Sequence, residues 1–455
     1  MASHTHSGTT PPTAHPPGLA TLFLVEMWER FSYYGMRAIL VLYCVAPATL
    51  GGLGFSTQQA SSLYGTYIMA VYLLSLPGGF IADRWLGAGR AVFLGGLVIS
   101  AGQFCLLSPS LAFFYSGLSL ITIGTGLLKP NVSAMVGALY PPQDPRRDSG
   151  FSIFYMGINV GAVLAPLVCG FLAESPAFQS WLAARGLDPH SSWRWGFAAA
   201  GVGMLAGLAV FLLRRPTIAH IGLRPQKKNQ PAHSATHAPL TADEARRLAA
   251  ISILFVFTIL FWSAYEQKGA SLNLFAKHLV QTSVGSFHFP ASWLQSITAF
   301  YVILLAPLFA RLWVRLGRRQ PSSPAKFAIG LAAIGFAFCI LTAASGLTAQ
   351  GRISPLWLAA VYLFDVIGEL CLSPVGLSTV TKVAPARLVG LMMGAWFFAT
   401  SLGNKLAGFF STFFDPTSPA TLMTLYGSIA AALLVSSLVL FLAAPALRRL
   451  MGDAR

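Results

Sequence analysis

The sequence predicts an all-α membrane protein that crosses the bilayer with twelve transmembrane helices, six in each half of the chain. Three observations lead to this prediction. Of the 455 residues, 55% are hydrophobic and only 10% are charged, whereas soluble domains carry about 25% charged residues. The apolar residues form long runs, and roughly 20 consecutive apolar residues span a bilayer as a helix. A polar segment near the middle of the chain separates six such runs from the other six.

The apolar runs and the polar segments between them define the predicted organisation. Residues 1–18 are rich in Ser, Thr, His and Pro and lack the basic start and apolar core of a signal peptide, so we expect a disordered tail. A first six-helix bundle covers 19–213, a linker 214–246, a second bundle 247–447 and a tail 448–455. The predicted spans are 20–47, 60–82, 88–108, 110–132, 150–173, 194–213, 247–273, 292–315, 327–346, 355–377, 387–411 and 420–446.

The basic residues indicate how the chain is oriented. The net charge is +16, and 21 of the 30 Lys and Arg residues lie in tails, linker and loops on one side of the predicted spans, against four on the other side. Because basic loops stay in the cytoplasm, both termini and the linker are predicted to be cytoplasmic. The excess of positive charge is therefore explained by the orientation of the protein in the lipid bilayer, and it predicts no nucleic-acid partner.

The cysteines and histidines predict neither a metal site nor a cofactor. The five cysteines are isolated in apolar stretches, with no CxxC spacing and no cluster of His and Cys. Such a pattern indicates neither a disulfide framework nor a zinc site. We expect no bound metal and no cofactor.

Ten charged residues fall inside the predicted spans, apart from the arginines near span ends that we count with the adjoining loops. Charge at that depth is costly and usually marks a polar cavity or an ion path. Long side chains that reach the membrane surface from helix ends explain Lys405 and Lys268. The same explanation fails for residues well inside their spans. The full set is Glu26, Glu29, Arg30, Arg37, Lys129, Glu266, Lys268, Asp365, Glu369 and Lys405.

Depth along the helices suggests which of these charges meet. At 1.5 Å per residue, Arg37 and Glu266 both lie in the outer half of the membrane, one in each half of the chain. Lys129 and Glu369 both lie toward the inner side, again one in each half. Two such pairs would act as the outer and inner gates of an alternating-access transporter.

The same residues predict proton coupling. A buried carboxylate changes its proton occupancy when a cationic partner arrives or leaves. Since no histidine lies inside a predicted span, carboxylates must carry the proton. Glu26 and Arg30 are four residues apart and can pair along one helix face. We expect Glu26, Glu29, Arg30 and Glu266 to form the proton-coupling set.

Around these charges, the motif Glu26-Met-Trp-Glu29-Arg30-Phe-Ser-Tyr-Tyr-Gly35 resembles the signature of the proton-dependent oligopeptide transporter family of the major facilitator superfamily. Supporting similarity extends along the whole chain apart from the tails and linker. It includes Gly78–Arg90, Gly126–Ser133, Phe151–Pro166, Phe261–Gly269, Leu294–Ala310, Gly368-Glu369 and Met392–Phe398.

This resemblance implies the major facilitator fold. It also implies a proton-coupled symporter of the bacterial inner membrane that binds di- and tripeptides in a central cavity and imports them. By the same resemblance, Arg30, Arg37 and Lys129 would face the peptide carboxylate, and Asn159 and Glu369 the amine. Thr298 stands where the family usually has an Asn that contacts the amine. The implied pocket walls are Tyr33, Tyr34, Tyr72, Trp262 and Trp396. We expect a monomer.

Other functions remain open. Relatives of this fold carry nitrate, so an anion or other small-solute carrier is the alternative substrate class. Charges of both signs favour a zwitterionic peptide, because an anion does not need Glu369. An intramembrane enzyme is disfavoured, since no span carries a Ser/His or metal-ligand cluster. A gated channel is disfavoured by the paired charges in both halves.

Overall fold

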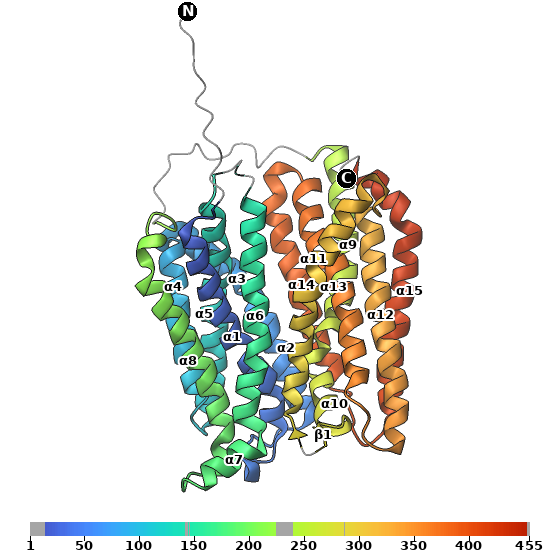
Figure 1. The fold of residues 1–455 in the computed structure, drawn as a ribbon. Helices are drawn as coiled ribbons and strands as arrows, with labels where there is room; N and C mark the ends of the chain where they lie inside the picture. The colour runs from blue at the N-terminus through green and yellow to red at the C-terminus, as the bar shows by residue number, and fades with distance from the viewer. Residues whose placement is uncertain (1–13, 142–143, 145, 224–239, 286, 453–455) are drawn as a thin grey trace, which may run out of the picture.

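Twelve membrane helices in two bundles make up the computed structural model, which describes residues 14–141, 144, 146–223, 240–285 and 287–452. The first bundle lies on the left of Figure 1 and the second on the right. The first contains α1 (Pro17–Val45), α2 (Thr57–Leu73) continued by α3 (Ser75–Ile81) and a π turn (Ala82–Leu86), α4 (Ala88–Cys105), α5 (Leu111–Ala138), α6 (Arg147–Glu174) and α8 (Ser192–Leu213). The second contains α9 (Ala242–Tyr265) with α10 (Ser271–Leu279), α11 (Ser296–Leu316), α12 (Ser323–Leu347), α13 (Leu356–Val383), α14 (Val389–Ser411) and α15 (Pro419–Met451).

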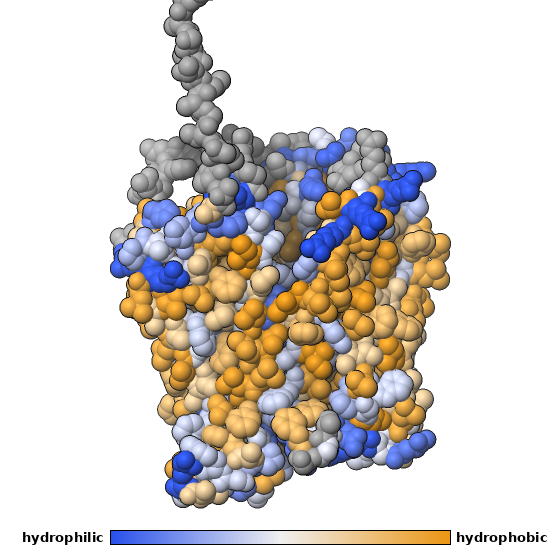
Figure 2. Space-filling model, in the orientation of Figure 1, coloured by the Kyte–Doolittle hydropathy of each residue, from blue (hydrophilic) through white to orange (hydrophobic). Residues whose placement is uncertain are grey.

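The start of α1 and the end of α15 lie at the same end of the molecule (Figure 1). We call this end the terminal end and the opposite one the distal end. A broad hydrophobic band surrounds the middle of the visible face, and hydrophilic residues gather toward both ends (Figure 2). Within the described residues, ten helical segments are long and apolar enough to span a membrane by themselves. The other two of the twelve are α1, which carries four charged side chains, and α14.

Local sequence signals explain several helix ends. Ser56 caps α2 by accepting a hydrogen bond from the backbone of Gln59, whose side chain bonds back to Ser56. Thr241 and Glu244 form the same reciprocal cap at the start of α9. Such caps satisfy backbone N–H groups that have no partner within the helix. The linker therefore ends at Thr241, and α9 begins a few residues earlier than the span predicted from hydrophobicity.

Glycines permit a close approach between the bundles at α2 and α14. A Cβ placed on Gly65 of α2 would lie 2.8 Å from the Cα of Gly408 on α14, which is closer than real side chains come. Small residues allow helix backbones to approach in membranes, where dispersion contacts rather than the hydrophobic effect hold helices together. The α2–α14 contact is one of the seams at which the two bundles meet.

The structure differs from the sequence prediction in four places. Predicted span 7 (247–273) is broken: α9 ends at Tyr265, and a 3-10 turn (Glu266–Gly269) precedes α10. A short helix, α7 (Pro176–Ala183), and a two-residue hairpin, β1 (Ser283–Val284) with β2 (Phe287–His288), lie outside the twelve spans. The last helix extends to Met451, so residues 448–451 of the predicted tail 448–455 are helical. Residues 1–13 of the predicted first tail and 224–239 of the linker lie outside the described residues.

The turn that breaks span 7 packs against the first bundle. A Cβ at Gly269 would collide with the hydroxyl group of Tyr64 on α2. Glycine is therefore required where the turn passes this tyrosine. The turn directs Glu266 and Lys268, both nearly fully buried, into the protein rather than along the side of a continuous helix.

Candidate substrate and proton site

The predicted outer pair is present in the structure. Arg37 on α1 donates from Nη2 to Glu266 Oε2 at 2.5 Å, and from Nε to the Tyr64 hydroxyl at 2.7 Å. Arg37 is 5% exposed and Glu266 3% exposed. This ion pair joins the two bundles in the distal half of the molecule, and Tyr64 is a partner that the sequence analysis did not identify.

A second ion pair between the bundles was missed from the sequence. Glu174, the last residue of α6, accepts from Lys277 of α10 at 3.0 Å and from the backbone N–H of Ser292 at 3.3 Å. The Glu174 side chain is 1% exposed, whereas that of Lys277 is 44% exposed. Glu174 lies one residue beyond a predicted span and Lys277 fell in a predicted loop, so neither was counted among the membrane charges. The sequence did contain a signal for this pair, because Glu174 and Lys277 carry opposite charges and follow the same ends of two predicted spans.

Backbone carbonyl groups add further links between the bundles. Asn273 donates to Ala38 at 2.8 Å, and Trp293 donates to Leu167 at 2.9 Å. Ser401 donates to Met69 at 2.6 Å across the α2–α14 seam. Together with the two ion pairs, these bonds hold the bundles together toward the distal end.

The predicted inner pair is not formed in this structure. No ion pair joins Lys129 and Glu369, which are both half-buried. The ammonium of Lys129 lies 3.7 Å from the centre of the Tyr72 ring, and Glu369 accepts a hydrogen bond from the Tyr265 hydroxyl. The bundles are linked toward the distal end, and Lys129 of the first bundle and Glu369 of the second are not in contact. Figure 2 shows a recess between the bundles at the terminal end.

The charged motif of α1 forms a compact cluster. Arg30 Nε contacts Glu26 Oε1 at 3.2 Å and also bonds Glu29 Oε2. All three side chains are buried, yet Glu26 Oε2, Glu29 Oε1 and Arg30 Nη2 have no hydrogen-bond partner. Buried polar atoms are usually satisfied. The two carboxylate oxygens can therefore take a proton or accept a hydrogen bond from water or a solute, and the guanidinium nitrogen can donate one.

Several predicted wall residues surround these charges. Tyr33 packs under the Arg30 guanidinium with 5.0 Å between Cζ and ring centre, and Tyr34 lies edge-on to Tyr33. Tyr34 and Tyr72 remain half-exposed, while Tyr33 is buried. Trp262 and Trp396 are buried too, and Trp396 packs mainly against Phe255 and Phe327 of its own bundle.

Asn159, predicted to meet the amine, and Thr298, which stands at the position of the family Asn, are both buried. Asn159 donates from Nδ2 to the Tyr155 carbonyl on its own helix at 2.9 Å. This bond leaves the side-chain carbonyl of Asn159 as the group that could accept from an amine. The Thr298 hydroxyl is buried and has no hydrogen-bond partner among the residues that the structure describes.

Two intramembrane lysines have environments that the sequence did not reveal. The prediction that Lys268 reaches a helix end is wrong: it is 6% exposed and its ammonium lies 3.0 Å from the Tyr265 ring centre. Lys405 is half-buried and donates to the Thr66 hydroxyl at 2.6 Å across the α2–α14 seam.

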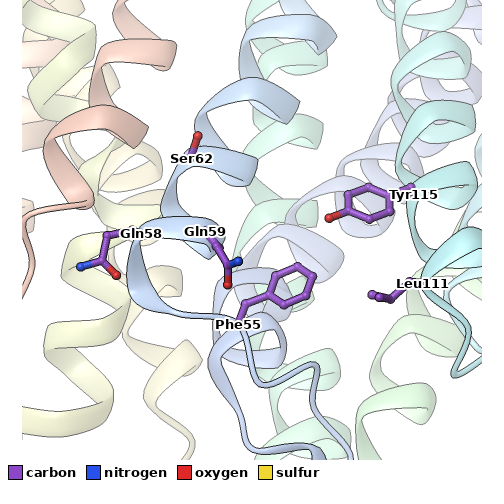
Figure 3. Close-up of a pocket in the computed structure, with 6 residues that line it drawn as sticks. All are labelled: Phe55, Gln58, Gln59, Ser62, Leu111 and Tyr115. Atoms are coloured by element: carbon purple, nitrogen blue, oxygen red, sulfur yellow. The ribbon is translucent and has the colours of Figure 1, made fainter.

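Other features can be separated from this site. A hollow at the distal ends of α2 and α5 is lined by no charged side chain (Figure 3) and contains none of the residues above. Its lining is Phe55, Gln58, Gln59, Ser62, Leu111 and Tyr115.

In the loop before α6, hydrogen bonds from Arg146 lower the pKa of Asp144 to about 2. Asp144 therefore stays ionised near neutral pH and is no candidate for proton coupling. The described residues contain no cluster of three or more His, Cys, Asp or Glu side chains suited to a metal ion.

Comparison with known proteins decides the family. The sequence profile of the POT family matches residues 89–241 and 226–425. The chain belongs to the POT family. It is 38% identical to the peptide transporter YePEPT of Yersinia enterocolitica, over 97% of this chain and 96% of the relative. It is 36% identical to the di-/tripeptide transporter of Lactococcus lactis subsp. cremoris, over 97% of each chain.

Solved structures of POT transporters share the fold. A crystal structure of a point mutant of the peptide transporter POT in complex with alafosfalin superposes with a TM-score of 0.87 at 37% identity, covering 96% of both chains. A POT family transporter in complex with 5-aminolevulinic acid gives a TM-score of 0.83 at 30% identity, covering 95% of this chain and 97% of the other. The predicted major facilitator fold, with twelve helices in two bundles, is thereby confirmed.

Proposed function

We propose that this POT protein is a proton-coupled symporter that imports di- and tripeptides by alternating access. The proposal rests chiefly on one observation: Arg37 and Glu266 join the bundles distally, while Lys129 and Glu369 stand unpaired on opposite bundles. One gate pair is closed while the other is open, as expected for one state of an alternating-access cycle. The names of the similar proteins supply the substrate class.

The proposed orientation places the terminal end in the cytoplasm and the distal end outside the cell. The excess of basic residues in the tails, the linker and the loops on the terminal side supports it. The protein would then be a monomeric, multi-pass protein of the bacterial inner membrane, open toward the cytoplasm in the present state. Its partners would be peptides, protons and lipid, and it would catalyse no chemical reaction.

Recognition would depend on the peptide termini, since these are common to all substrates. Arg30, Arg37 and Lys129 offer cations to the carboxylate. Glu369, with the Asn159 carbonyl and the Thr298 hydroxyl, offers acceptors to the amine. Aromatic walls that carry no charge suit varied side chains; they are Tyr33, Tyr34, Tyr72, Trp262 and Trp396.

Proton coupling would operate through the ion pairs themselves. A proton on Glu266 would end its attraction to Arg37, open the distal mouth and free Arg37 for a peptide carboxylate. The cluster of Glu26, Glu29 and Arg30 supports a second exchange of protons, because its carboxylates retain unpaired oxygen atoms beside a single guanidinium.

Counterflow of labelled dialanine into liposomes tests the proposal, measured with and without an imposed pH gradient. We expect exchange without a gradient and net accumulation when the outside is acidic. A protonophore should abolish the accumulation but leave exchange intact. If nitrate is carried and dialanine is not, the protein is an anion carrier instead.

A further inference from the structure

A buried lysine lies among three carboxylates in the second bundle. Lys268, in the turn after α9, interacts electrostatically with Glu369 and Asp365 of α13 and with Glu266. Glu266 already has a cation, because Arg37 bonds to it. Lys268 forms no ion pair within 4 Å with any described carboxylate, and its ammonium rests on the Tyr265 ring, 3.0 Å from the centre. It is a cation without a fixed partner.

Asp365 is the carboxylate that lacks compensation. It is 1% exposed, its Oδ1 has no hydrogen-bond partner, and no described residue forms an ion pair with it. An ionised carboxylate is costly to bury alone. The charges that act on Asp365 are Lys268 and, on its own helix, Glu369.

Asp365 and Glu369 are one helical turn apart, so their side chains lie on the same face of α13. Tyr265, whose ring carries the Lys268 ammonium, donates its hydroxyl to Glu369. The Tyr265 side chain thus links the lysine to Glu369, the group that we have assigned to the peptide amine. Its ammonium has the charge and hydrogen-bonding capacity of that amine.

We propose that Lys268 is a tethered competitor of the substrate amine at Glu369, and that Asp365 holds this lysine away while peptide is bound. The proposal rests on the proposed peptide function. With peptide present, Lys268 pairs with Asp365 and Glu369 takes the amine. When Lys268 turns to Glu369, it displaces the amine and promotes release. A tethered group acts at a high effective concentration, so it lowers the apparent affinity for peptide by the fraction of Glu369 that it occupies.

Dialanine binding to purified variants tests this inference. Removing the competitor in Lys268→Met should tighten dialanine binding by about tenfold. Removing the holding group in Asp365→Asn should weaken it by a similar factor, because Lys268 then stays at Glu369. Binding of N-acetyl-dialanine, which has no amine, should change little in either variant. Tyr362→Phe, which removes an unpartnered hydroxyl near Asp365, is the matched control and should bind as the wild type does.

The double variant Lys268→Met with Asp365→Asn separates this role from a structural ion pair, and its charge balance is unchanged. If Asp365 acts through Lys268, the double variant should bind dialanine as tightly as Lys268→Met. Wild-type affinity in the double variant, or shifts of the same sign in both single variants, would overturn the proposal. Failure of wild-type protein to bind dialanine would instead reject the proposed peptide function.

Discussion

The substitution Glu266→Gln removes the charge of the distal gate while keeping the shape of the side chain. In the present structure Glu266 accepts from Arg37 at 2.5 Å, with both groups almost fully buried. Glutamine can still accept this hydrogen bond through its side-chain carbonyl. What is lost is the neutralisation of a buried guanidinium, and the substitution resembles a Glu266 that always carries a proton.

The size of the effect follows from this burial. Removing one partner of a buried ion pair costs about 3–5 kcal/mol, and the retained hydrogen bond favours the lower end of this range. The cost applies only while the distal mouth is closed, since Arg37 gains water when the mouth opens. A bias of about 3 kcal/mol shifts the balance between closed and open states by roughly 100-fold. That shift favours the state with the distal mouth open but leaves a small population with the mouth closed.

Two transport modes should therefore respond differently. Glu266→Gln should lose accumulation of dialanine driven by a pH gradient, because no proton can be released at this position. It should retain some exchange of dialanine, because exchange requires no net movement of protons. Both modes are measured in one liposome preparation.

Glu174→Gln is the matched control, since it makes the same chemical change at the other distal ion pair. If Glu266→Gln concentrates dialanine to the wild-type ratio, the assignment of proton coupling to Glu266 is incorrect. Glu26 or Glu29 would then be the leading candidate. If both variants lose accumulation equally, the effect belongs to the distal closure in general and not to a proton on Glu266.

Three further predictions concern the other charged groups. Lys129→Ala should abolish uptake driven by a pH gradient, because Lys129 is the proposed partner of both Glu369 and the peptide carboxylate; uptake at the wild-type rate would exclude both roles. Acetylation of the dialanine amine should weaken competition against labelled dialanine at least about tenfold, because Glu369 is left desolvated without a cation; equal competition would favour an anion carrier. Glu174→Gln should change the uptake rate modestly and leave the accumulation ratio unaltered. The reason is that the Lys277 side chain is 44% exposed, and exposed pairs contribute up to about 1 kcal/mol. A changed ratio would show that Glu174 carries a coupled proton.

Much of the fold could be predicted from the sequence because hydrophobic length is a local property. A run of about 20 apolar residues forms a helix in lipid wherever it lies in the chain, since every backbone polar group must be satisfied internally. Depth along a helix is equally local. The matched depth of Arg37 and Glu266 could therefore be predicted from residue counts alone, and the two side chains are in contact in the structure.

Contacts that depend on helix rotation could not be predicted in this way. Counting residues gives depth but not the face of a helix on which a side chain lies. Lys268 was expected to reach a helix end, yet in the turn after Tyr265 it is buried with its ammonium on the Tyr265 ring. That turn packs against Tyr64, which is distant in sequence, so no local pattern around Lys268 predicts the contact.

The sequence by itself determined the membrane class, the twelve spans, their distribution over two halves and the charges that occur at matched depth. Only the tertiary structure decided which of these charges meet. Arg37 and Glu266 are in contact and Lys129 and Glu369 are not, although both pairs satisfy the same depth rule. The reason is that a pair across the two bundles forms only at the end where the bundles touch. That end is a property of the conformational state, and one sequence must be compatible with more than one such state.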